Sequence, residues 1–96
     1  VAMDKNTKII EVGETSYVLK RRPHSQWLKY FGKIMSFTTG DTGGSVMEIN
    51  DLGVASEFVF DHMLVRPKVG IDEVENFTDL MEITMEGISF QMTSRN

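Results

Sequence analysis

The sequence contains no cysteine, which excludes disulfide bridges and thiolate metal sites and fits a reducing compartment. It also has no apolar run near the ~20 residues that a membrane-spanning helix needs. Residues 1–6 lack the apolar stretch of a signal peptide. Histidine and proline are scarce, with two residues each. Without disulfides or a membrane, we expect the fold to depend on a hydrophobic core.

The chain is short, and its composition is that of one globular domain. It has 96 residues, of which 41% are hydrophobic and 25% are charged. A domain of this size buries roughly 60–65% of its unfolded surface, which is enough for a single core. We expect a disordered segment at residues 1–7, one domain at residues 8–93 and a tail at residues 94–96. Met3 is a candidate natural start after two added residues.

The net charge of −4 conceals an uneven distribution of charged residues. Residues 1–47 carry seven Lys/Arg and four Asp/Glu, whereas residues 48–96 carry three and ten. The basic residues are concentrated in a span without carboxylates, at Lys20, Arg21, Arg22, Lys29 and Lys33. Two interpretations stay open: solvated faces of opposite sign that attract each other, or patches for different partners.

Alternating residues near the N-terminus predict a β-hairpin over residues 8–21. Its turn is Gly13-Glu14-Thr15, where glycine permits a positive φ. The apolar residues that alternate with polar neighbours are Ile10, Val12, Tyr17 and Leu19. An isolated hairpin is marginally stable in water, so this apolar side must pack on a helix.

A short helix is predicted after Pro23, a residue that suits the first turn of a helix. Its apolar residues follow at helical spacing: Trp27, Leu28, Phe31, Ile34 and Met35. Gly32 weakens it by about 1 kcal/mol relative to alanine. We therefore expect about three turns, held mainly by the apolar stripe.

Residues 37–44 contain three glycines and three threonines and predict a mobile loop. A phosphate-binding loop would need Lys and Ser/Thr after the last glycine, where Ser45 and Val46 stand. A calcium-binding loop would need several carboxylates, and Asp41 is alone. We therefore predict no ligand for this loop.

A second helix begins at Ser45, with Glu48 completing a capping box, or at Asn50 or Asp51. It ends before Pro67, because the residue before a proline disfavours helical geometry. Its shared face consists of Leu52, Ala55, Phe58, Val59, His62 and Met63.

A third helix is predicted after Gly70, with Asp72 and Glu75 as its N-cap pair and Thr78 as a second candidate start. Its face consists of Val74, Phe77, Leu80, Met81, Thr84 and Ile88, and Phe90 and Met92 extend it. The sequence therefore predicts an α+β fold, mostly α-helical, with an N-terminal β-hairpin packed on about three helices.

No catalytic constellation is recognisable, and we predict no catalytic, cofactor or metal site. Catalysis needs a nucleophile with a base, a metal, or carboxylates paired around a cleft. The two histidines, His24 and His62, lie outside any such motif. Asp61 is adjacent to His62 and therefore points elsewhere on a helix. We expect His62 to pack at the boundary of the core.

One cluster favours nucleic-acid binding, because basic residues 20–22 precede Trp27, Tyr30 and Phe31. The net charge of −4 and the pI near 5.0 argue against nucleic-acid binding. Trp27 and Phe31 also belong to the apolar stripe of the predicted helix, so we expect them to be buried. We therefore expect a protein-binding domain and keep a small nucleic-acid-binding regulator as the alternative.

Methionine is abundant, with seven residues, and five of them lie in the second half: Met47, Met63, Met81, Met85 and Met92. Methionine fills irregular core gaps and also recurs on adaptable binding surfaces, and both interpretations stay open. The candidate partner-binding residues are Lys20, Arg21, Arg22, Met63, Met81 and Met85.

Residues 8–90 resemble a family of small tail assembly chaperones, which occur in long-tailed phages and prophages of Gram-positive bacteria. The resemblance depends on the hairpin end Tyr17-Val-Leu-Lys-Arg-Arg-Pro23 before a Trp/Leu/Phe helix, and on Phe58-Val-Phe-Asp-His-Met-Leu-Val-Arg-Pro-Lys-Val69. An acidic cap and a Phe…Leu-Met-Glu helix follow, over residues 71–82, and a Gly-Ile-Ser-Phe ending lies at residues 87–90.

The resemblance implies a non-enzymatic role in virion assembly, without a cofactor. Such chaperones bind the hydrophobic tape measure protein, keep it soluble and help the tail tube protein to polymerise around it. The resemblance further implies self-association, a location in the host cytoplasm and absence from the mature virion. A head–tail connector or other structural virion component is a further alternative.

Overall fold

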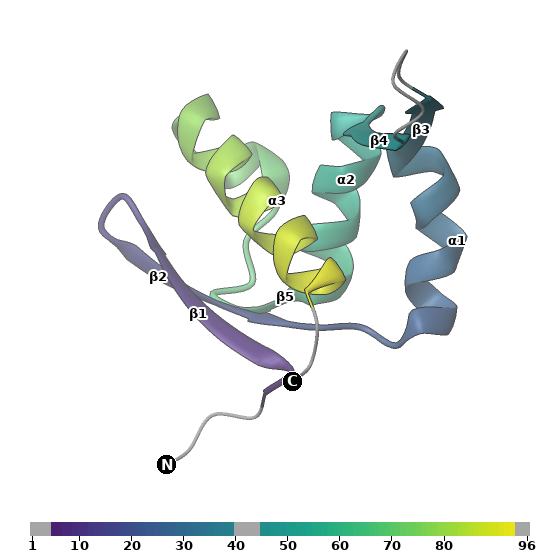
Figure 1. The fold of residues 1–96 in the computed structure, drawn as a ribbon. Helices are drawn as coiled ribbons and strands as arrows, with labels where there is room; N and C mark the ends of the chain where they lie inside the picture. Colours follow the sequence, from purple (N-terminus) through teal and green to yellow (C-terminus); the bar gives the residue numbers. More distant parts are fainter. Residues whose placement is uncertain (1–4, 40–44, 94–96) are drawn as a thin grey trace.

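The computed structural model describes residues 5–39 and 45–93 and has an α+β fold (Figure 1). Three predicted segments lie wholly or partly outside these residues: the N-terminal segment, the glycines of the loop and the C-terminal tail. In chain order, the elements are strands β1 (Thr7–Val12) and β2 (Thr15–Lys20), helix α1 (His24–Ile34), strands β3 (Met35–Thr39) and β4 (Ser45–Ile49), helix α2 (Leu52–Phe58), the π-helix η1 (Val59–Met63), strand β5 (Leu64–Arg66), the 3₁₀-helix η2 (Ile71–Glu73) and helix α3 (Phe77–Met92).

The predicted hairpin is confirmed, with β1 and β2 paired antiparallel from Thr7 opposite Lys20 to Val12 opposite Thr15. Gly13 opens the two-residue turn with a φ of 64°, which a glycine adopts without strain. The four alternating apolar residues of the hairpin are all buried, as the alternation predicts.

Strand β5 adds a third strand beside β2, where a helix was expected to continue until just before Pro67. That expectation is wrong for the last residues, because the helix ends in a π-helical turn at Met63. Leu64 pairs with Leu19 of β2, and both side chains are buried. The apolar run fits a buried strand as well as a helix, and pairing with β2 decides between them.

The expected loop is wrong at residues 37–39, which form a strand, whereas residues 40–44 lie outside the described residues; the helix start at Ser45 is also wrong. Strands β3 and β4 pair antiparallel, from Met35 opposite Ile49 to Thr39 opposite Ser45, so the backbone at Ser45 and Glu48 is a strand and not the first turn of a helix. The alternative start is confirmed, because Asp51 caps α2 and its Oδ1 accepts a hydrogen bond from the Val54 N–H at 3.1 Å.

Helix α3 starts later than the predicted N-cap pair at Asp72 and Glu75. Residues 71–73 form a single 3₁₀ turn, in which Glu73 Oε1 accepts a hydrogen bond from the Gly70 N–H at 2.9 Å. Helix α3 begins at Phe77, next to the second candidate start. Its end at Met92 confirms the predicted extension.

Helix α2 lies between α1 and α3, with the three-stranded sheet across one end of the helices (Figure 1). Aromatic rings join α1 to α2: the Phe58 ring centroid is 5.0 Å from those of both Trp27 and Tyr30. Phe58 has no exposed surface, so this cluster belongs to the core.

Helices α2 and α3 approach each other closely along a line of small side chains. The Ser56 and Thr84 hydroxyls share a buried hydrogen bond of 3.0 Å. One turn further along α3, Gly87 lies against Val59, and a Cβ at position 87 would be 2.7 Å from Val59 Cγ2. Glycine is therefore the residue that this approach requires.

Helix α3 also covers the inner face of the sheet. The Lys8 ammonium of β1 forms a salt bridge of 3.0 Å with Glu86 of α3, and Ile10 and Val12 are buried beside it. The completely buried apolar side chains come from five different elements: Leu19, Ile34, Ala55, Phe58, Val59, Met63 and Ile83. The helices and the sheet thus share one hydrophobic core.

Replacing Gly87 by alanine is expected to lower the free energy of unfolding by about 1–2 kcal/mol. Overlap with both Val59 methyl groups outweighs the helix propensity that alanine gains. Gly32→Ala is the matched control, because no atom lies within 4 Å of a Cβ there, and it should stabilise by up to about 1 kcal/mol. Urea denaturation measures both. Equal stability of the two variants would contradict the close approach.

Candidate functional site

The candidate methionines do not form one surface. Met63 has no exposed surface and lies in the core, so it cannot contact a partner in this fold. Met81 is half-buried and Met85 is 45% exposed, and both lie on α3. The structure therefore leaves Met81 and Met85 as the methionines of the prediction that reach the surface.

Met81 borders an opening of about 270 Å³ between the N-terminal parts of α2 and α3, which we name the apolar groove. Its lining is mostly apolar: Leu52, Gly53, Ser56, Glu57, Ile71, Phe77, Leu80 and Met81. Two large side chains at its border are exposed, Leu52 at 43% and Phe77 at 73%. The sequence places each of them on the apolar face of its helix.

The relative orientation of α2 and α3 creates the apolar groove. Figure 1 shows that the two helices converge toward their C-terminal ends and separate toward their N-terminal ends. The small residues Ser56, Thr84 and Gly87 hold them together in the convergent part. Phe77 and Leu52 stand where the helices separate, so they border an opening.

Phe77, Met81 and Met85 follow each other at intervals of four residues along α3. Residues at this spacing lie on one side of a helix, so the apolar surface extends from the groove along α3 for about two turns. Exposed apolar side chains are common singly, whereas a continuous strip is typical of a binding surface.

Arg21 is 5% exposed and takes part in the structure of the domain. Its Nε donates a hydrogen bond to the Phe90 carbonyl oxygen at 3.0 Å, and its guanidinium lies 4.3 Å from the centroid of the Phe90 ring. Its Nη1 donates to the Lys5 carbonyl oxygen and to Asn6 Oδ1, both at 3.2 Å. We name this set of contacts the Arg21 clamp.

Gln91 completes the attachment of α3 to the chain after β2. Its Oε1 accepts from the Arg22 N–H at 2.8 Å, and its Nε2 donates to the Arg22 carbonyl oxygen at 3.0 Å.

The sequence did not predict the burial of Arg21, because arginine is usually a surface residue. The signal that could have found it is the alternation Tyr17, Leu19, Arg21, in which all three side chains are buried.

His62 lies at the boundary of the core, as the sequence predicts, and bridges α1 and η1. Gln26 Oε1 accepts from Arg22 Nε at 2.7 Å, which turns Gln26 Nε2 toward His62 Nδ1 at 3.0 Å. His62 Nδ1 is thus the acceptor, and Nε2–H donates to the Tyr30 hydroxyl at 2.8 Å. The hydrogen bonds of Gln26 and Tyr30 to His62 therefore hold α1 against η1. Burial of Trp27, which also lies on α1, adds an apolar contact.

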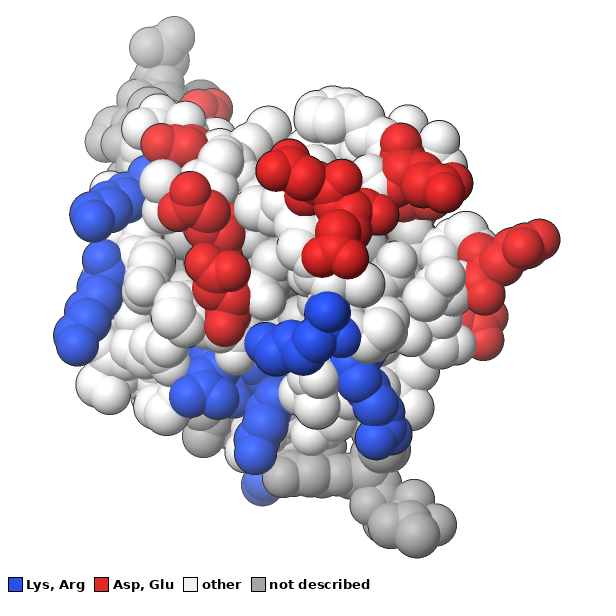
Figure 2. Space-filling view, turned by 180° about the vertical axis from the view of Figure 1, so that it is seen from behind, with Lys and Arg blue, Asp and Glu red and all other residues white. Residues whose placement is uncertain are grey.

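Charged side chains of opposite sign gather in different regions of one face. Figure 2 shows acidic side chains over its upper part and basic side chains along its lower part and one lateral edge. Lys20, the remaining member of the basic triplet, is exposed. Such a distribution affects the association rate and orientation of charged partners more than affinity.

The described residues contain no group of three or more His, Cys, Asp or Glu side chains placed to hold a metal ion. Within residues 5–39 and 45–93, no helix has the length and apolar character that crossing a membrane requires.

Comparisons of the chain with protein-family models, with curated proteins and with solved structures find no significant match.

Arg21→Ala is expected to lower the free energy of unfolding by about 2–3 kcal/mol. The substitution removes charge-assisted hydrogen bonds and leaves the Phe90 carbonyl oxygen with the Thr93 N–H, at 3.3 Å, as its remaining donor. Lys20→Ala is the control, because Lys20 is exposed, and its effect should stay within about 0.5 kcal/mol. Thermal and urea unfolding measure both variants. An Arg21→Ala protein as stable as Lys20→Ala would show that the clamp contributes nothing to stability.

Proposed function

We propose that the protein is a phage tail assembly chaperone that binds an amphipathic helix of the tape measure protein in the apolar groove. The observation that carries this proposal is the groove itself, with Leu52 and Phe77 exposed at its border. The residues that resemble the chaperone family support it, and they include Phe77, Leu80 and Met81 of the groove.

A helix is the partner that such a surface favours. Two helices that separate toward one end leave a groove into which a third helix can lay its apolar face. Phe77, Met81 and Met85 repeat every four residues, so they can follow the apolar stripe of a helix alongside. The flexible methionines can adapt to the different apolar side chains of a long partner.

Binding of this kind suits a chaperone. The tape measure protein is long and hydrophobic, so its amphipathic helices would aggregate before the tail tube protein encloses them. A reversible apolar contact shields them and can be displaced during tube assembly. In this proposal the protein acts in the host cytoplasm, self-associates along its partner and is absent from the mature virion.

The alternative of a nucleic-acid-binding regulator has less support. Trp27 is buried and Arg21 is engaged in the clamp, so neither is offered for stacking on bases or for contact with phosphates. A structural virion component would use an apolar groove too. Mass spectrometry of purified particles distinguishes it from a chaperone, which must be absent from them.

Co-expression with the tape measure protein is expected to raise the soluble yield of that protein. Phe77→Ala and Met85→Ala should each weaken the complex by about tenfold, because each removes an exposed apolar side chain that binding would bury. Isothermal titration with a purified amphipathic segment of the tape measure protein gives the dissociation constants.

Leu28→Ala is the matched control for the groove variants. Leu28 lies on α1, is 67% exposed and does not line the groove, so its removal should leave affinity unchanged. If Leu28→Ala and Phe77→Ala lower the affinity equally, the binding surface is not the apolar groove. If no complex forms and the soluble yield stays constant, the proposed function is wrong.

A further inference from the structure

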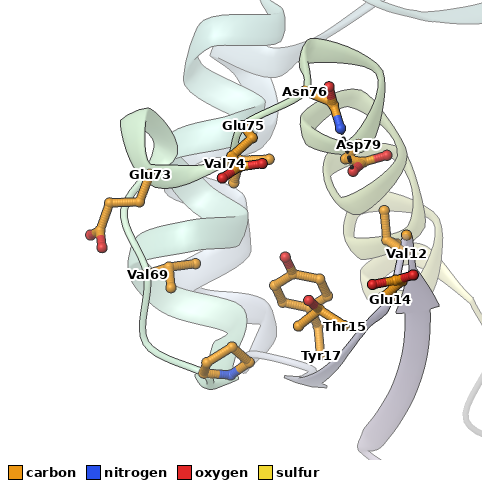
Figure 3. A pocket seen from close by; sticks show the side chains of 12 residues that line it. Val12, Glu14, Thr15, Tyr17, Val69, Glu73, Val74, Glu75, Asn76 and Asp79 are labelled. Carbon is orange, nitrogen blue, oxygen red and sulfur yellow. Dashed lines mark hydrogen bonds between the residues drawn. The ribbon is translucent and has the colours of Figure 1, made fainter.

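A second opening, of about 580 Å³, lies between the hairpin turn, the segment after β5 and the first turn of α3 (Figure 3). We name it the acidic pocket. Its lining residues come from these three parts: Val12, Gly13, Glu14, Thr15, Tyr17, Pro67, Val69, Glu73, Val74, Glu75, Asn76 and Asp79. A volume of this size falls among pockets that bind small organic ligands, ~300–1,000 Å³.

The lining carries four carboxylates and no basic side chain. Glu73 and Glu75 come from η2 and the residues that follow it, Glu14 from the hairpin turn and Asp79 from α3. Arg66 and Lys68 flank Pro67 in the chain but do not line the pocket. Among all the described residues, Glu14 and Glu75 form no hydrogen bond or ion pair, so their charges are not neutralised by the described part of the protein.

The two other carboxylates are partly engaged. Glu73 accepts its hydrogen bond from the Gly70 N–H, and Asp79 Oδ2 accepts a long one from Asn76 Nδ2 at 3.4 Å. Each carboxylate has acceptor capacity beyond one such bond. Figure 3 shows the Glu73 carboxylate turned away from Tyr17, so the acceptors that the pocket offers come from Glu14, Glu75 and Asp79, which lie in three different parts of the chain.

Tyr17 supplies an independent indication of a ligand. Its side chain is only 8% exposed, and Figure 3 shows its hydroxyl pointing into the pocket. Within residues 5–39 and 45–93, this hydroxyl has no hydrogen-bond partner. No buried side-chain oxygen of the described residues lacks a partner, so this hydroxyl is open to the solvent in the pocket and is available to a ligand there. A donor in the pocket would pair it.

We propose that the acidic pocket binds an arginine side chain of a protein partner. A guanidinium group is planar and presents five N–H donors, which suits acceptors that come from several directions. It is less strongly hydrated than an ammonium group and stacks on aromatic rings, so Tyr17 and the neighbouring Val12, Val69 and Val74 suit it. The carboxylates compensate its charge.

The acidic pocket is separate from the apolar groove, although both border the start of α3. Phe77, Leu80 and Met81 face the groove, whereas Asn76 and Asp79 face the pocket. Arginine binding therefore does not depend on the proposed chaperone function, and each can be tested without the other.

Titration of the ¹⁵N-labelled full chain with N-acetyl-arginine-methylamide tests this inference by NMR. We expect a dissociation constant on the order of millimolar and shifts at the amides of Gly13, Glu14 and Asn76. Glu14→Gln, Glu75→Gln and Tyr17→Phe should each weaken binding about threefold. Glu57→Gln is the matched control, because it removes the same charge from the groove instead, and it should leave binding unchanged.

N-acetyl-citrulline-methylamide, the neutral isostere, should produce no shifts at these amides. The corresponding lysine compound should bind several-fold more weakly than the arginine compound. Equal binding of citrulline would overturn the role of charge, and equal binding of lysine would overturn the assignment to arginine. Absence of localised shifts with the arginine compound, on a chain whose spectrum is that of a folded protein, would overturn the inference itself.

Discussion

The contact between Gly87 and Val59 fixes how closely α2 and α3 pack, and the rest of the domain depends on it. No Cβ fits at position 87, because the Val59 side chain packs directly on the backbone of α3 there, and the Ser56–Thr84 hydrogen bond continues the close packing toward the N-terminal ends. Beyond that hydrogen bond the side chains are large, and the helices separate. The contact that holds the helices together thus also determines where they leave an apolar opening.

The sheet is attached to α3 at both ends of the helix, and the two attachments differ. The Arg21 clamp and the Lys8–Glu86 salt bridge bind it near the C-terminal end. At the other end Gly13 comes close to Asp79 but leaves the acidic pocket beside the turn. Tight polar contacts at one end and an opening at the other follow from one antiparallel arrangement of β1 on α3.

Much of the fold could be predicted from the sequence, because period-two and helical patterns mark the hairpin and the helices directly. Strand β5 could not, since its three residues belong to an apolar run without distinctive periodicity. The pairing of β3 with β4 could not be predicted either, because the glycines and threonines of residues 37–44 are typical of a loop. At the candidate site, spacing placed Phe77 on an apolar face, but only packing shows that this face stays exposed. Burial of Met63 and Arg21 is likewise decided by tertiary contacts.

The Arg21 clamp joins residues that lie 69 positions apart. A ribosome releases the hairpin before α3, so the apolar side of the hairpin has no cover from α3 until that helix is made. A hairpin alone is marginally stable, and β5 also arrives late. Folding of the hairpin during synthesis must therefore wait for α3, and the nascent hairpin has to stay free of aggregation until α3 leaves the ribosome.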